Sequence, residues 1–139
     1  MKLKKLRSNK LIEVPIKKYL VKWDEPCRSK FQYNVKQWFK PYWRGHICLE
    51  EFMIPGSRLR VDLVNLNKRI LVEINGVQHD EFNEHFHRNS RLQFLGQITR
   101  DQAKKDWAEA NNFRVIEILP EDLPLSREFF REKYGIEIL

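Results

Sequence analysis

Two acidic residues, Asp62 and Glu73, stand in neighbouring apolar runs, and their types and spacing suit the binding of a divalent cation. Residues 59–64 (LRVDLV) and 70–75 (ILVEIN) alternate along the chain in the two-residue period of a β-strand. The first run contains Asp62 and the second contains Glu73. The pattern predicts a β-hairpin with one acidic residue on each strand.

The turn between these runs decides whether the two carboxylates meet. Asn67 and Lys68 can form a two-residue turn, since Asn tolerates the positive φ that such hairpins need. That turn places Asp62 directly opposite Glu73, with Cβ atoms about 4.5–5.5 Å apart. Like charges so close repel each other, so the arrangement favours a hard cation such as Mg²⁺ or Mn²⁺ between them. The alternative is a solvated sheet face, because a different loop length would slide Asp62 opposite Leu71.

Length and composition indicate one folded domain with a basic surface. The 139 residues can bury a core without disulfides, and no apolar run approaches the roughly 20 residues of a membrane span. Cys27 and Cys48 are too few for a disulfide framework or a cysteine zinc site, and the amino terminus lacks a secretory signal. A cytoplasmic location is expected. The net charge of +7 favours a polyanionic partner.

Positive charge is concentrated at the amino terminus. Residues 1–22 contain one acidic residue, Glu13, against Lys2, Lys4, Lys5, Arg7, Lys10, Lys17, Lys18 and Lys22. We expect residues 1–28 to form a basic arm, partly packed on the domain 29–139 through its few apolar side chains. Its DNA-binding residues are predicted to be Lys2, Lys4, Lys5, Arg7 and Lys10. The alternative is a tail that only aids solubility.

A helix and a third strand are predicted ahead of the hairpin. Ser29 can cap a helix whose aromatic stripe predicts a buried face, with Pro41 interrupting it. Residues 46–54 form the strand, joined to the hairpin by a turn at Pro55-Gly56. That turn would place Glu51 opposite Arg60, where a cross-strand ion pair is the simplest role.

The segment after the hairpin, 77–90, is rich in histidine. His79, His85 and His87 could together bind zinc, although their spacing matches no standard zinc motif. A helix is then predicted over 90–110, with a break allowed near Gly96. Residues 113–119 (FRVIEIL) are apolar on both faces, as expected of a central strand, and Ser126 and Gly135 bound a last helix.

These motifs, in this order, resemble the restriction-endonuclease-like superfamily, PD-(D/E)XK. They are Asp62 on the second strand, EINGVQH leaving the third, Arg100-Asp101 ahead of a helix, and the strand FRVIEIL. The likeness is greatest to the very-short-patch-repair branch, including its EDxHD homing endonucleases, and covers about residues 29–120. It implies an α/β fold with a restriction-endonuclease-like core. The mixed sheet would join a three-strand antiparallel meander to a further central strand, with helices flanking it.

The resemblance also implies roles for single residues. Asp62 matches the metal-binding aspartate and Glu73 the acidic residue of the E-x-K element, while Asn75 stands where lysine is expected. Gln78 or His79 would then serve at the attacking water, and His79 matches the functional histidine of the branch. Further matches or candidate accessory residues are Asp101, Gln32 (where the first helix usually supplies glutamate), Glu51, Arg100 and Lys104.

The sequence thus predicts a DNA endonuclease that hydrolyses phosphodiester bonds with Mg²⁺ or Mn²⁺ held by Asp62 and Glu73. His79 could carry a proton to or from the reacting oxygens. The expected partner is DNA; double-strand cutting would favour a homodimer or a larger DNA-processing complex. Two alternatives stay open. One is a DNA-binding or assembly subunit that keeps the nuclease fold without turnover, and the other is a zinc-binding protein.

Overall fold

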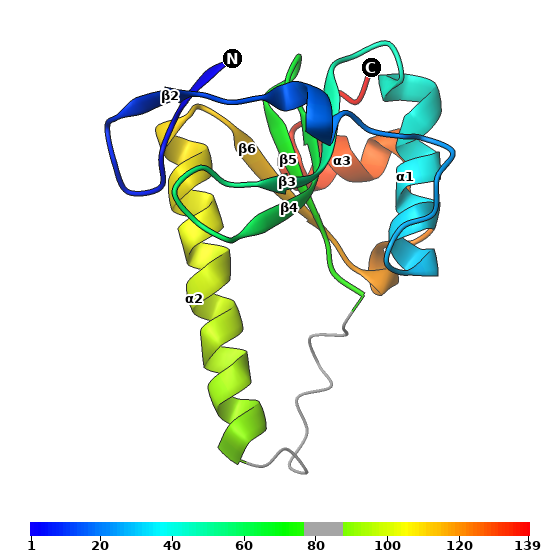
Figure 1. The fold of residues 1–139 in the computed structure, drawn as a ribbon. Coiled ribbons are helices and arrows are strands. Elements are labelled where there is room, and N and C mark those ends of the chain that lie inside the picture. Colours follow the sequence, from blue (N-terminus) through cyan, green and yellow to red (C-terminus); the bar gives the residue numbers. More distant parts are fainter. Residues whose placement is uncertain (77–87) are drawn as a thin grey trace.

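The protein is a mixed α/β structure, seen in a computed structural model that describes residues 1–76 and 88–139, with 88–90 described as backbone only. Its elements follow one another along the chain as β1 (Lys2–Lys4), β2 (Leu11–Glu13), the 3-10 helix η1 (Ile16–Tyr19), α1 (Lys30–Trp43), β3 (Cys48–Met53), β4 (Arg60–Asn65), β5 (Ile70–Ile74), α2 (Arg88–Ala110), β6 (Arg114–Ile118), the 3-10 helix η3 (Pro120–Asp122) and α3 (Arg127–Tyr134) (Figure 1).

The main sheet has the strand order β3-β4-β5-β6. The strands β3, β4 and β5 form the predicted antiparallel meander, and β6 runs parallel to β5. The prediction that residues 113–119 form a central strand is wrong, because β6 is the last strand in the order and pairs with β5 alone among the described strands. It is apolar on both faces because helices cover both faces of the sheet at this edge.

Two apolar clusters hold the helices on the sheet, one on each face. Figure 1 shows α1 and α3 on one side of the sheet and α2 on the other. In the first cluster Phe39 of α1 and Phe130 of α3 pack with Val72 of β5, and all three are fully buried. In the second, Trp107 of α2 packs with Leu71 of β5. The sheet is thus the middle of three layers.

Helix α1 begins where the sequence predicted and ends later. The Ser29 hydroxyl accepts a hydrogen bond from the backbone N–H of Gln32 at 3.1 Å, so the predicted cap is confirmed. The predicted interruption at Pro41 is wrong, since the helix runs on to Trp43. Proline removes one backbone hydrogen bond near the helix end, and the burial of Trp43, at 0% exposure, keeps the last turn in place.

The helix α2 is continuous, and no break occurs at Gly96, where the sequence allowed one. It is the long helix at the side of the sheet in Figure 1, and its amino-terminal half extends beyond the strands. Within residues 1–76 and 88–139, no helix combines the length and the apolar character that crossing a membrane requires.

The amino-terminal residues form a small hairpin. Strand β1 pairs antiparallel with β2, and Leu3 and Val14 are buried in the α2-side cluster. The Trp107 indole N–H donates to the backbone carbonyl of Lys4 at 2.7 Å, which fastens the hairpin to the carboxyl-terminal half of α2. Part of the basic segment therefore packs on the domain. Lys2 and Lys4 of this segment belong to strand β1 of the folded hairpin.

Candidate active site

The hairpin β4–β5 has the predicted register but not the predicted turn, because its loop spans residues 66–69 and the positive φ falls on Arg69 (55°) instead of Asn67. Leu63 pairs with Val72 and Asn65 with Ile70, so the same register places Asp62 opposite Glu73. The regular pairing stops at Leu63, and beyond it the Asp62 carboxylate itself accepts the backbone N–H of Ile74 at 2.7 Å. Asp62 therefore occupies the point where the two strands part.

The register between β3 and β4 differs from the prediction and changes what Glu51 faces. The backbone N–H of Ile54 donates to the carbonyl of Leu59 at 2.8 Å, so the connecting loop is longer than the predicted two-residue turn. Strand pairing then places Glu51 opposite Asp62 instead of Arg60. The predicted cross-strand ion pair with Arg60 is wrong, and a third carboxylate joins the row that Asp62 and Glu73 form.

The strands are irregular where Glu51 meets Asp62. Glu51 has φ 49°, a left-handed conformation that costs about 1–3 kcal/mol for a residue other than glycine. Leu63 packs in the α1-side cluster and Val61 in the α2-side cluster, although residues two apart on a regular strand share a face. The alternation of side chains along β4 is therefore broken at Asp62, where the carboxylates of Asp62 and Glu51 are on opposite strands.

The carboxylate of Glu51 is held from the side of α1. The Gln32 amide donates to Glu51 Oε1 at 3.0 Å, and an Arg28 guanidinium nitrogen lies 3.5 Å from Oε2. Gln32 itself is only 8% exposed. The side chain that stands where the resemblance expects a glutamate therefore orients a glutamate of the neighbouring strand.

Glu73 is a buried carboxylate with one cationic partner. Lys104 of α2 places its ammonium nitrogen 3.2 Å from Oε2, and the side chains of Glu73 and Lys104 are 18% and 14% exposed. No donor in the described part of the chain reaches the other oxygen, Oε1, which is itself buried. Burial raises the pKa of Glu73 to about 8, Lys104 opposes that rise, and the nearby charge of Asp62 adds to it.

Asp62 has a similar environment. Burial raises the pKa of Asp62, the hydrogen bond from the backbone of Ile74 opposes the rise, and the charge of Glu51 adds to it. Ionised together, the carboxylates on these strands repel one another in a site that solvates them poorly. A cation between Asp62 and Glu73 would relieve both costs.

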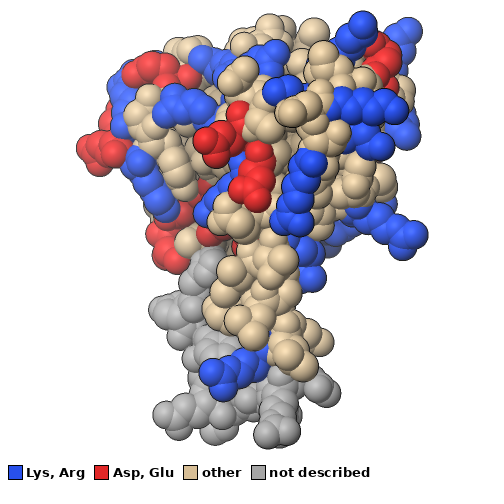
Figure 2. Space-filling model, turned by 90° about the vertical axis from the view of Figure 1, so that its left-hand side faces the viewer, with Lys and Arg blue, Asp and Glu red and all other residues tan. Residues whose placement is uncertain are grey.

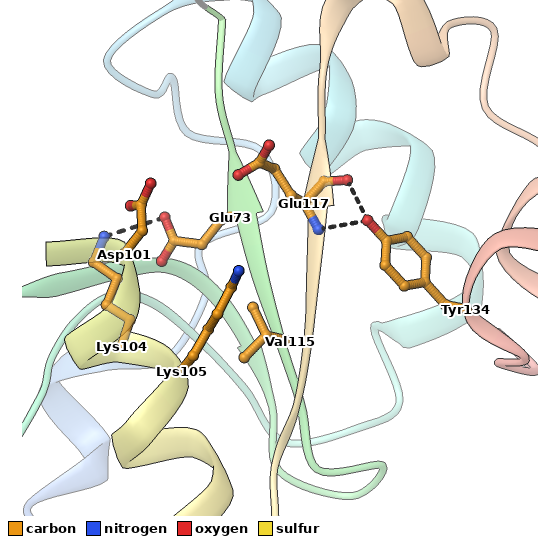
Figure 3. Close-up of a pocket in the computed structure, with 7 residues that line it drawn as sticks. All are labelled: Glu73, Asp101, Lys104, Lys105, Val115, Glu117 and Tyr134. Atoms are coloured by element: carbon orange, nitrogen blue, oxygen red, sulfur yellow. Dashed lines mark hydrogen bonds and ion pairs between the residues drawn. The ribbon is translucent and has the colours of Figure 1, made fainter. Parts of the chain in front are cut away.

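A pocket of about 270 Å³ opens beside Glu73, between α2 and the strands β5 and β6. Figure 3 shows Asp101 and Lys104 reaching from α2 toward Glu73. Tyr134 stands at the far side, where its hydroxyl donates to the carbonyl of Glu117 at 3.0 Å and accepts the backbone N–H of the same residue at 3.1 Å. Three of the predicted site residues, Glu73, Asp101 and Lys104, thus line the same pocket.

Sequence reasoning missed Glu117, which also lines this pocket. In the parallel pairing of β5 with β6, Glu117 is the direct partner of Glu73. One register across the sheet thus carries an acidic residue on each strand, namely Glu51, Asp62, Glu73 and Glu117. The available signal was a lone glutamate in the otherwise apolar run FRVIEIL.

The other predicted site residues lie at varying distances from this row. Asn75 is half-buried at the end of β5, where its backbone N–H donates to Ile118 at 3.0 Å. Arg100 donates to the Gln97 side chain at 3.0 Å, and Gln97 in turn donates to Asp101 at 3.0 Å. Lys2, Lys4, Lys5, Arg7 and Lys10 belong to the amino-terminal hairpin and the turn between its strands. Gln78, His79, His85 and His87 lie outside the described residues.

The residues at the site fit a hard divalent cation in their chemistry. Carboxylate oxygens are the ligands that Mg²⁺ and Mn²⁺ prefer, and the buried Glu73 Oε1 has no hydrogen-bond partner among the described residues. Within residues 1–76 and 91–139, no three or more His, Cys, Asp or Glu side chains are gathered closely enough to form a metal cage. Mg²⁺ is usually bound by one or two carboxylates and keeps several water ligands, so Asp62 and Glu73 would be enough protein ligands for it.

Comparisons with known proteins give two partial matches. The chain is 37% identical over 65 residues to uncharacterized protein 033L of Invertebrate iridescent virus 3, which is 47% of this chain and 33% of that protein. It is 37% identical over 60 residues to uncharacterized protein 307L of Invertebrate iridescent virus 6, or 43% of this chain and 30% of that protein. The chain thus spans about a third of the length of these relatives. No protein-family model and no solved structure matches it.

Proposed function

We propose that this protein is a metal-dependent DNA endonuclease with a restriction-endonuclease-like core. The observation that carries the proposal is the buried Glu73 carboxylate, which lies opposite Asp62 in the register and keeps one oxygen free of hydrogen-bond donors from the described residues. Buried carboxylates that are only partly compensated, as Glu73 is by Lys104, are costly, and a divalent cation would offset the remaining cost. The net charge of +7 and the ordered PD-(D/E)XK-like motifs support DNA as the substrate.

Asp62 and Glu73 would hold Mg²⁺ or Mn²⁺ between them. When bound, such an ion neutralises charge on a phosphate and favours deprotonation of a water molecule. The backbone N–H of Ile74 donates a hydrogen bond to the Asp62 carboxylate, which is therefore oriented in the absence of a ligand. Gln32 and Arg28 orient Glu51 at the neighbouring position of the row.

Lys104 supplies the cationic group that Asn75 lacks. Its ammonium lies 3.2 Å from Glu73, where it stabilises the ionised carboxylate. The same ammonium would also attract a DNA phosphate that binds to an ion held by Asp62 and Glu73. A lysine from helix α2 would thus take the role that the resemblance assigns to a strand lysine. His79 stays the predicted proton carrier.

The second candidate is a DNA-binding subunit without turnover. It is favoured by Asn75 at the expected lysine position, and by Lys104, which already compensates part of the charge of Glu73. Both candidates predict DNA binding. They differ in whether divalent ions produce cleavage.

A cleavage assay separates the two candidates. Labelled duplex, nicked, mismatched, branched and single-stranded DNA would be incubated with the protein in Mg²⁺, in Mn²⁺ and in EDTA. The endonuclease proposal predicts ion-dependent products from at least one substrate, and their loss with Glu73→Gln. Glu109→Gln makes the same chemical change at an exposed position of α2 and should cleave like wild type. Absence of products from every substrate in both ions would leave the binding subunit as the better account.

A further inference from the structure

The amino-terminal half of α2 is an exposed helical projection. Figure 1 shows it extending beyond the sheet, on the same helix that carries Asp101 and Lys104 to the candidate site. Residues 91–100 are exposed except for the half-buried Gly96. At 1.5 Å per residue this segment is about 15 Å long, a length that can follow a groove of a nucleic acid.

One side of this projection is polar and leads directly to Glu73. Gln93, Gln97, Arg100 and Lys104 recur at the spacing i, i+4, i+7 and i+11, which places them on one face of a helix and defines a polar stripe. Arg100 donates to Gln97 at 3.0 Å, and Lys104 contacts Glu73 at 3.2 Å. The polar stripe therefore runs from the candidate active site outward along α2.

The side chains of the polar stripe have the chemistry that binds DNA. Arg100 is the cationic group in its exposed part, Asp101 beside it accepts a hydrogen bond from Gln97 at 3.0 Å, and Arg91 lies about 200° from Gln93, off the stripe. Figure 2 shows the side of α2 that faces away from the sheet, where most side chains of the described projection are tan; the polar stripe is on the other side, with Lys104 and Glu73. Guanidinium and amide groups bind phosphates and the edges of bases in the major groove, which is about 12 Å wide and admits an α-helix.

We propose that the polar stripe of α2 is a DNA-binding surface, and that the projecting half of the helix lies in the major groove of the duplex whose backbone reaches Glu73. The inference rests on the proposed function, because it takes DNA to be the substrate. It adds a contact surface separate from the amino-terminal hairpin, which is fastened to the other half of α2 through Trp107. The projecting helix would position the duplex relative to the candidate active site.

Charge substitutions on opposite sides of the helix test this surface. Position 93 lies on the polar stripe, whereas Leu95, 52% exposed, lies about 200° further round the helix. Both side chains are exposed, so Gln93→Lys, Gln93→Glu, Leu95→Lys and Leu95→Glu should all fold. DNA affinity would be measured in EDTA over a range of salt concentrations, with circular dichroism and size-exclusion chromatography confirming fold and oligomeric state.

The proposal predicts a difference between the two faces. Gln93→Lys should tighten binding and steepen the slope of log affinity against log salt by about 0.9, the value for one added phosphate contact. Gln93→Glu should weaken binding several-fold, and both Leu95 variants should stay within about twofold of wild type. Equal effects at 93 and 95, no effect at 93, or no DNA binding by the wild-type protein would overturn the proposal. So would loss of binding in Leu95→Glu together with dissociation of a dimer, because the apolar side would then be an interface between copies.

Binding without a divalent ion keeps this test separate from the endonuclease proposal. If Gln93 variants change affinity as expected and the wild-type protein cuts no DNA, the surface stands and the enzyme assignment fails. If the protein cuts DNA and Gln93 variants bind like wild type, the enzyme assignment stands and this surface is wrong.

Discussion

Replacing Glu73 with glutamine should stabilise the metal-free protein, and by an amount that grows with pH. Burial raises the pKa of Glu73 from its ordinary 4.5 to about 8. Between these values the folded protein holds a proton that the unfolded chain has lost. The stability contributed by protonated Glu73 is therefore fully present below pH 4.5 and declines as pH rises toward 8.

The size of the effect follows from the same pKa values. One pKa unit corresponds to about 1.4 kcal/mol, so the rise from 4.5 to about 8 amounts to roughly 5 kcal/mol at and above pH 8. At pH 7 the cost is about 3 kcal/mol by the same conversion. Glutamine preserves the shape of the side chain without the charge, so Glu73→Gln should remove most of this cost.

Urea unfolding in EDTA at pH 5, 7 and 9 measures the prediction. The free energy of unfolding of Glu73→Gln minus that of wild type should be small at pH 5 and reach several kcal/mol at pH 9. Glu109→Gln, at an exposed position, should show no such trend. A difference that is independent of pH, or one that shrinks as pH rises, would refute the account of Glu73 as a buried, poorly compensated carboxylate.

Further substitutions test Lys104 and the amino-terminal hairpin. Lys104→Met should lower the cleavage rate by about tenfold or more, since it removes the ammonium beside Glu73, whereas Lys17→Met, at an exposed position of η1 outside the pocket, should change it much less. Leu3→Ala should cost about 2–4 kcal/mol in urea unfolding because Leu3 is 2% exposed, and an effect below 1 kcal/mol would show that the hairpin is not part of the core. Lys10→Gln should leave stability unchanged and make the salt dependence of DNA binding shallower; an unaltered slope would place Lys10 off the DNA.

The sequence was informative wherever local patterns decide the structure. Alternation placed Asp62 opposite Glu73 in the correct register, although the predicted two-residue turn is wrong: the loop spans residues 66–69 and Arg69, not Asn67, has positive φ. Ser29 and Ser126 were correctly identified as helix caps from their position before an apolar run. These features depend on neighbours a few residues apart, which is the range over which sequence patterns are reliable.

Features set by loop length or by packing were missed. One longer loop moved Glu51 from Arg60 to Asp62, since register depends on the number of residues in the turn. The edge position of β6 and the pairing of Glu117 with Glu73 depend on how the chain crosses after α2. The amino-terminal hairpin was missed because its strands are very short. A hydrogen bond from Trp107, which is far away in the sequence, holds it on the domain.

Binding of Mn²⁺ tests the central claim, that Asp62 and Glu73 together hold a divalent cation, most directly. Electron paramagnetic resonance would count free Mn²⁺ during titration of the wild-type protein and of Asp62→Asn, with unfolding curves confirming that both are folded. The account predicts that wild type removes at least one equivalent of Mn²⁺ from solution and that Asp62→Asn removes far less at the same concentrations. No uptake by wild type, or equal uptake by the variant, would contradict it.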